Sequence, residues 1–182
     1  MSRLSTALSN ATAQILPPSK DSSASLAAGN PAMLAAIARC KKLLNRRALT
    51  AAAASAVPVP GLDWAVDAAL MSKLIPEINA QFGLTEAQIE KLDPAKREKV
   101  QKAVTVVGTM LIGKLITKDL VLAAAKTIGV RLTAKTAAKF VPLAGQAVSA
   151  MIGYAAIRYF GEQHIADCVR VAKSAQLALP AA

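Results

Sequence analysis

The residues best suited to chemistry are few in this chain of 182 residues. His164 is the only histidine, and the carboxylates Glu162 and Asp167 lie close to it in the sequence. An imidazole can act as a general base toward a nucleophile, but the chain has no G-x-S-x-G motif that would supply one. We therefore expect His164 to lie solvated at a helix surface, and we predict no catalytic residue.

The two cysteines, Cys40 and Cys168, lie far apart and lack the CxxC spacing of metal-binding or redox sites. Free cysteines often serve as small buried apolar side chains, and this is the interpretation adopted for both. The sequence thus predicts no metal site and no disulfide framework.

Gly108-Thr109-Met110-Leu111-Ile112-Gly113-Lys114 has the spacing of a phosphate-binding loop. Leu115 follows where a Ser or Thr should hold magnesium, and the intervening residues are bulky and apolar. The segment also falls within an apolar stripe at helical spacing, so we expect a helix here. We predict no nucleotide, no other cofactor and no enzymatic activity.

The chain is strongly basic, with 22 Lys and Arg against 11 Asp and Glu, a net charge of +11. A nucleic-acid partner is not predicted, because aromatic residues for base stacking make up only 3%. Anionic lipid headgroups or an acidic protein require only the charge. The candidate contact residues are Arg39, Lys42, Arg46, Arg47, Lys96, Lys99 and Lys102. The alternative for each group is an ordinary solvated helix face.

Composition predicts an all-α fold, a bundle of five or six helices. Hydrophobic residues make up 54%, and alanine, the strongest helix former, occupies 40 positions. Asn30, Asp63, Thr85, Asp93 and Asp119 are the expected helix caps. The predicted helices are 31–56, 64–82, 86–92, 94–117, 120–139 and 146–176. Residues 1–30 are predicted to be a flexible tail, residues 31–176 the helical domain, and residues 177–182 a short C-terminal tail.

Two Pro-Gly elbows are expected to interrupt the helices, because proline cannot continue a helix interior. They comprise Pro58, Pro60 and Gly61 in the first and Pro142 and Gly145 in the second. Beyond the second elbow, Ser149, Gly153 and Gly161 keep the same four-residue register, a pattern that lets two helices approach closely. The uncharged run 140–157 is at the lower limit for a membrane span. A buried helix in a soluble bundle is the alternative.

Four segments of the sequence together resemble a bacterial helical domain of unknown function. They are Asn45-Arg46-Arg47, Val57-Pro58-Val59-Pro60-Gly61-Leu62-Asp63, Gln81-Phe82-Gly83 and Val141-Pro142-Leu143-Ala144-Gly145. That domain occurs in inner-membrane proteins and C-terminal to Era-like GTPases, and it is similar to the helical part of interferon-inducible GTPases. The resemblance covers roughly residues 36–172. It implies association with the bacterial inner membrane, peripheral or shallowly inserted, and partnership with a GTPase, and it carries no catalytic residues.

We therefore predict a non-enzymatic, membrane-associated helical domain that contacts anionic lipid, a GTPase or another acidic protein. Self-association into a homo-oligomer is a further expectation. Two alternatives stay open: a soluble, cytoplasmic helical adaptor, and a toxin that permeabilises membranes.

Overall fold

The computed structural model describes residues 23–54, 62–117, 119–121, 123 and 146–180. Within these ranges the regular structure is helical and no strand occurs. The helices are α2 (Ser23–Leu26), α3 (Pro31–Ala54), α4 (Leu62–Gln81), α5 (Glu86–Glu90), α6 (Pro94–Val107) and α8 (Gln146–Ser174). The prediction of an all-α helical bundle is confirmed.

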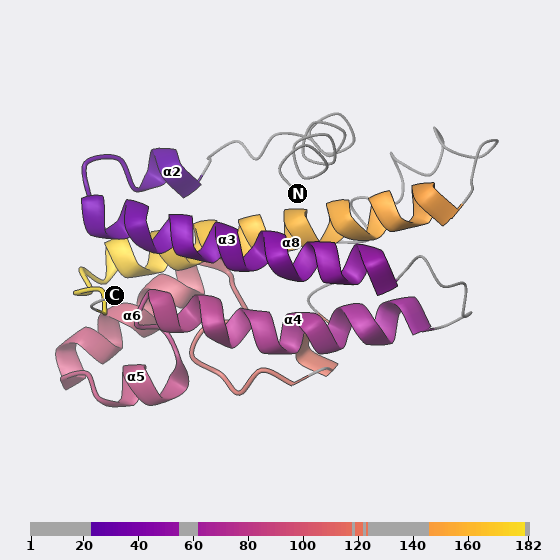
Figure 1. The fold of residues 1–182 in the computed structure, drawn as a ribbon. Coiled ribbons are helices and arrows are strands. Elements are labelled where there is room, and N and C mark those ends of the chain that lie inside the picture. The colour runs from indigo at the N-terminus through magenta and orange to yellow at the C-terminus, as the bar shows by residue number, and fades with distance from the viewer. Residues whose placement is uncertain (1–22, 55–61, 118, 122, 124–145, 181–182) are drawn as a thin grey trace.

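Three long helices, α3, α4 and α8, lie side by side, and α5 and α6 gather at one end of them (Figure 1). α3 runs antiparallel to both of its long neighbours, and its most extensive packing is against α8. The core between the helices is mostly apolar, and its fully buried members include Leu44, Leu74, Ile78, Phe82, Tyr154, Ile165 and Val169. Burial of such side chains is the main stabilising term of the fold.

Capping side chains next to the first turn determine where three of the helices begin. The Asn30 side-chain oxygen accepts from the Met33 amide at 3.0 Å, and the Asp93 carboxylate accepts from the Lys96 amide at 2.9 Å. Thr85 forms a reciprocal capping box with Gln88. These three caps are confirmed as predicted. α4 begins at Leu62, so Asp63 lies in its first turn instead of at the cap.

The helix that begins at Pro94 is shorter than the predicted range 94–117. α6 stops at Val107 because Gly108 adopts the left-handed conformation, φ 72°, and closes the helix with hydrogen bonds to Val104 and Thr105. Residues 108–117, hereafter the 108–117 segment, are non-helical, so the helical interpretation of the phosphate-loop-like run was wrong. Leu111 is buried, whereas Leu115 is 75% exposed.

The next helix also starts differently from the prediction. Thr117 Oγ1 accepts from the Leu120 amide at 3.2 Å, which is the capping role expected of Asp119. Residues 119–121 and 123 are helical. The remainder of the predicted helix 120–139 lies outside the described residues.

The described ends of the chain pack on the bundle. Ala27, in the predicted N-terminal tail, is buried beside α2, and Lys173 Nζ donates to the Leu26 carbonyl at 3.1 Å. At the other end, the Leu177 amide donates to the Ala172 carbonyl at 3.0 Å, closing α8. Leu177 and Leu179 then pack against the core.

Candidate functional site

A cluster of three polar side chains lies inside the bundle, between α4 and α8. Asn79 belongs to α4, and His164 and Cys168 are one turn apart on α8. His164 Nε2 is 2.9 Å from Asn79 Oδ1, and Cys168 Sγ lies 3.5 Å from that oxygen and 3.6 Å from the imidazole nitrogen. All three residues are buried, His164 being 3% exposed. The prediction of a solvated His164 was therefore wrong.

Asn79 also holds the 108–117 segment against the bundle. Its Nδ2 donates to the Leu111 carbonyl at 2.8 Å. Close by, the Gly113 amide donates to the Leu84 carbonyl at 3.2 Å. The Asn79 side chain thus connects α4, α8 and the 108–117 segment. It also gives a hydrogen bond to the buried Leu111 carbonyl, which would cost free energy if it had no partner.

Burial sets the protonation of this cluster. It lowers the pKa of His164 to about 4 and raises that of the Cys168 thiol well above its ordinary value, with Cys40 and Asp167 adding to the latter shift. Burial also raises the pKa of Cys40 to about 12. At neutral pH the imidazole is uncharged and both thiols are protonated, in keeping with the interpretation of the cysteines as buried small side chains.

This protonation state decides what chemistry the cluster supports. A cysteine nucleophile needs a thiolate, which a neighbouring imidazolium or other positive charge stabilises. Here a neutral imidazole faces a protonated thiol, and the three side chains are shielded from solvent. The arrangement therefore serves to connect helices, and within the described residues no group of His, Cys, Asp and Glu fits a metal ion.

The sequence contains a signal for Asn79 that is visible without the structure. Ile75, Ile78 and Phe82 recur at spacings of three and four, and Asn79 falls within that apolar stripe. A polar residue in a buried stripe requires hydrogen-bond partners. Which partners it finds depends on the packing of α8, which no local pattern specifies.

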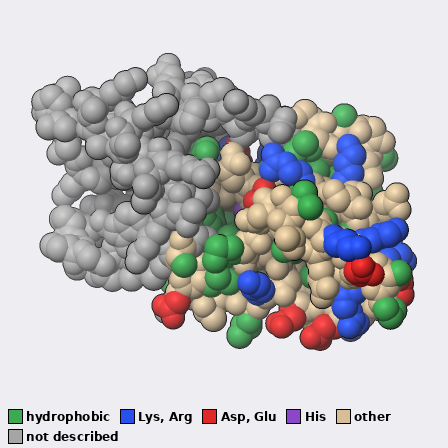
Figure 2. All heavy atoms as spheres, turned by 180° about the vertical axis from the view of Figure 1, so that it is seen from behind, with side chains coloured by type: hydrophobic (Ala, Val, Ile, Leu, Met, Phe, Trp, Pro, Cys, Tyr) green, Lys and Arg blue, Asp and Glu red, His purple; other side chains and the backbone are tan. Residues whose placement is uncertain are grey.

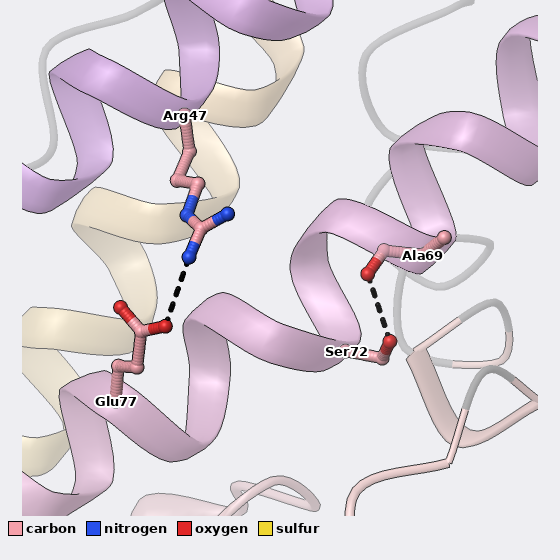
Figure 3. Close-up of polar contacts among 4 residues, drawn as sticks. All are labelled: Arg47, Ala69, Ser72 and Glu77. Atoms are coloured by element: carbon pink, nitrogen blue, oxygen red, sulfur yellow. Dashed lines mark hydrogen bonds and ion pairs between the residues drawn. The ribbon is translucent and has the colours of Figure 1, made fainter.

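Of the basic residues predicted as contacts on α3, two face α4 and two face outward. Arg39 Nε donates to Gln81 Oε1 at 2.6 Å, and Arg47 pairs with Glu77 at 3.0 Å (Figure 3). Both guanidinium groups therefore face α4. Lys42 and Arg46 are exposed on the outer face, so half of this predicted group is available to an external anion.

The basic residues predicted on α6 are all exposed, although two have acidic neighbours. Lys96 Nζ lies 3.3 Å from the Asp93 carboxylate, and Lys102 Nζ lies 2.8 Å from that of Glu98. Exposed pairs of this kind are weak. Figure 2 shows Lys and Arg side chains gathered at the end of the molecule that holds α5 and α6.

Exposed apolar side chains accompany these lysines. Val106 is 86% exposed at the end of α6, and Met110 and Leu115 of the 108–117 segment are 47% and 75% exposed. Lys99 and Lys114 are exposed in the same stretch of chain. The combination of large apolar side chains and lysines was not predicted, because helical periodicity places Leu115 on a buried stripe.

The predicted helix-packing and elbow residues are only partly within the described residues. Gly161 lies against Leu44 of α3, so close that a Cβ at position 161 would be 2.4 Å from Leu44 Cδ1. Ser149 and Gly153 lie in α8, but their surroundings are outside the described part. The elbow residues Pro58, Pro60, Gly61, Pro142 and Gly145 fall wholly outside it.

None of the helices in the described ranges combines the length and the apolar character that a membrane span requires. Comparison of the chain with protein-family models, with curated proteins and with solved structures found no match. The resemblance to the bacterial helical domain, with the partners it implies, therefore stays a prediction.

Proposed function

We propose that this is a non-enzymatic domain that binds peripherally to an anionic membrane surface through the end of α6 and the 108–117 segment. The observation that carries the proposal is the exposure of Val106, Met110 and Leu115 in the same stretch of chain as the exposed Lys99 and Lys114. Apolar side chains at such a surface enter the headgroup boundary, while lysines remain with the anionic headgroups.

Charge and burial together make this face more suitable than the outer face of α3. Each lysine near an anionic surface contributes about 1 kcal/mol, and the overall charge of +11 favours approach of the whole chain. Val106 and Leu115 are far more exposed than Leu34 or Leu49 of α3, which are 41% and 37% exposed. Apolar contact is what adds affinity to the electrostatic attraction.

The resemblance suggests which membrane is involved. It favours the bacterial inner membrane, whose anionic phospholipid suits a basic surface, with a GTPase as a protein partner. Both remain proposals that rest on the resemblance.

Sedimentation with vesicles tests the proposal. We expect binding to vesicles that contain phosphatidylglycerol, weaker binding in high salt, and little binding to pure phosphatidylcholine. Replacing Val106 and Leu115 by serine should weaken binding at least tenfold, as should K99E/K114E. The matched control is K42E/R46E, which makes the same change of charge on the outer face of α3 and should have the smaller effect.

Each other outcome has a definite meaning. Equal losses from the two charge-reversal pairs would show diffuse electrostatic attraction and overturn the assigned face. Absence of binding to anionic vesicles would overturn membrane association and leave the adaptor alternative. Release of a trapped dye from the vesicles would favour the membrane-permeabilising alternative.

A further inference from the structure

The link among α4, α8 and the 108–117 segment depends on one side chain. The Nδ2 of Asn79 donates to Leu111, which leaves Oδ1 to face His164 and Cys168. An amide oxygen only accepts hydrogen bonds. His164 Nε2 must therefore carry its hydrogen, and the neutral imidazole is held in the Nε2–H tautomer.

The opposite ring nitrogen has no partner among the described residues. His164 Nδ1 is buried and makes no hydrogen bond there. In the Nε2–H tautomer this atom is an acceptor left unsatisfied, which the fold tolerates at a cost. A proton added to the ring must go to Nδ1, where it would create a buried charge and a buried N–H donor that finds no acceptor among the described residues.

We infer that Asn79, His164 and Cys168 form an acid-sensitive latch, in which protonation of His164 separates α8 from α4 and releases the 108–117 segment. An imidazolium in this position must be hydrated, so water must enter between the helices where Asn79 lies. Water then competes for the amide that holds Leu111. The inference concerns the conformation of the segment and does not depend on membrane binding.

Several titratable groups lie near His164 on its own helix or beside Cys168. From α8 come the Cys168 thiol and the carboxylate of Asp167, which pairs with Arg170 at 2.9 Å. From α3, the buried Cys40 thiol lies close enough to Cys168 to raise the pKa of the Cys168 thiol further. Burial is the cause of the lowered pKa of His164. The carboxylates on this stretch are Glu162, which pairs with Arg158, and Asp167, whose pKa burial raises to about 6, so the experiment must separate Asp167 from His164.

Nuclear magnetic resonance can observe the latch directly, because the chain has a single histidine. At pH 7 we expect the ring nitrogens to show the neutral Nε2–H tautomer. Lowering the pH should protonate the ring well below its ordinary pKa of 6.5 and, in the same transition, lower the hydrogen-exchange protection of the Gly113 amide. After correction for the intrinsic exchange rate at each pH, we expect the equilibrium constant for opening at the Gly113 amide to increase on the order of 100-fold.

Variants assign the transition to named groups. Asn79→Ala should lower the protection of Gly113 already at pH 7, while core amides such as Val169 stay protected. Ser72→Ala is the matched control, since Ser72 is another α4 residue whose hydroxyl bonds the Ala69 carbonyl at 2.9 Å (Figure 3) and should leave Gly113 unchanged. His164→Phe should abolish the acid transition, and Asp167→Asn should retain it.

Two results would overturn the latch. The first is protonation of His164, at its ordinary pKa of 6.5 or below it, without any loss of protection at the Gly113 amide. This measurement uses the unaltered chain, so it decides the question even if a variant fails to fold. The second is an acid transition of Gly113 that persists in His164→Phe or disappears in Asp167→Asn.

Discussion

Gly161 of α8 lies directly against Leu44 of α3, and a Cβ added at position 161 would be 2.4 Å from Leu44 Cδ1 and 2.8 Å from Cδ2. Leu44 is fully buried, so its side chain has little room to yield. The close approach of the two most extensively packed helices is thus made possible by the absence of a side chain on one of them.

Gly161→Ala should therefore destabilise the bundle by about 1–3 kcal/mol, the usual cost of overpacking a core. Urea unfolding followed by circular dichroism measures it. Combining it with Leu44→Ala, which opens the space, should cost less than the sum of the single changes because the residues are in contact. If the free-energy costs of the two single changes simply add in the double variant, the new methyl group does not clash with Leu44.

Gly108→Ala should cost about 1–2 kcal/mol, because Gly108 has φ 72° and an L-residue is strained there. No described atom lies within 4 Å of the position of the added Cβ, so the cost is purely conformational. Gly108→Asn should be milder, since asparagine tolerates this backbone region. Equal losses for Ala and Asn in urea unfolding would argue against a backbone origin.

His164 should make the free energy of unfolding fall as the pH is lowered from 6.5 to 4. Its folded pKa of about 4 lies below the ordinary 6.5, so the unfolded chain takes the proton first. This contribution is fully present above pH 6.5, is lost on acidification, and amounts to about 3 kcal/mol. Unfolding titrations from pH 7 to 4 measure it, and His164→Phe should show a correspondingly smaller acid loss.

Asp167 should oppose that trend. Burial raises its pKa from 3.8 to about 6 in the folded chain, so the folded state binds the proton first, and the stabilisation is present below pH 3.8 and lost by pH 6. Because the side chain is 26% exposed, we expect about 1–2 kcal/mol. Asp167→Asn should thus steepen the loss of stability on acidification, in the same titration. An unchanged slope would mean that Asp167 is ionised and hydrated in the fold.

Features fixed by neighbours in the sequence were predictable. The caps at Asn30, Thr85 and Asp93 each use a side chain that bonds a backbone amide three residues ahead, and such geometry belongs to the segment itself. The all-α class was predictable from alanine content for the same reason. These features need no knowledge of the rest of the molecule.

Features fixed by another helix were not predictable. Val104, Val107, Leu111 and Leu115 continue a helical period, yet Gly108 ends the helix, and Leu111 is buried only because the segment turns back to Asn79. His164 shares an apolar stripe with Phe160 and Cys168 at spacings of four, but its partner Asn79 depends on the position of α4. Likewise, Arg39 and Arg47 look equivalent to Lys42 and Arg46 until the position of α4 is known.

The pairing of α3 with α8 also constrains how the chain is made. α3 (Pro31–Ala54) leaves the ribosome long before α8 (Gln146–Ser174) is synthesised, so the apolar stripe that includes Leu44 lacks its main partner until then. Contacts between segments so distant in sequence form slowly, and a nascent chain with such an uncovered surface is prone to aggregate. The cost of placing the two halves of this interface so far apart in the sequence is thus an apolar surface that stays uncovered until α8 has been made.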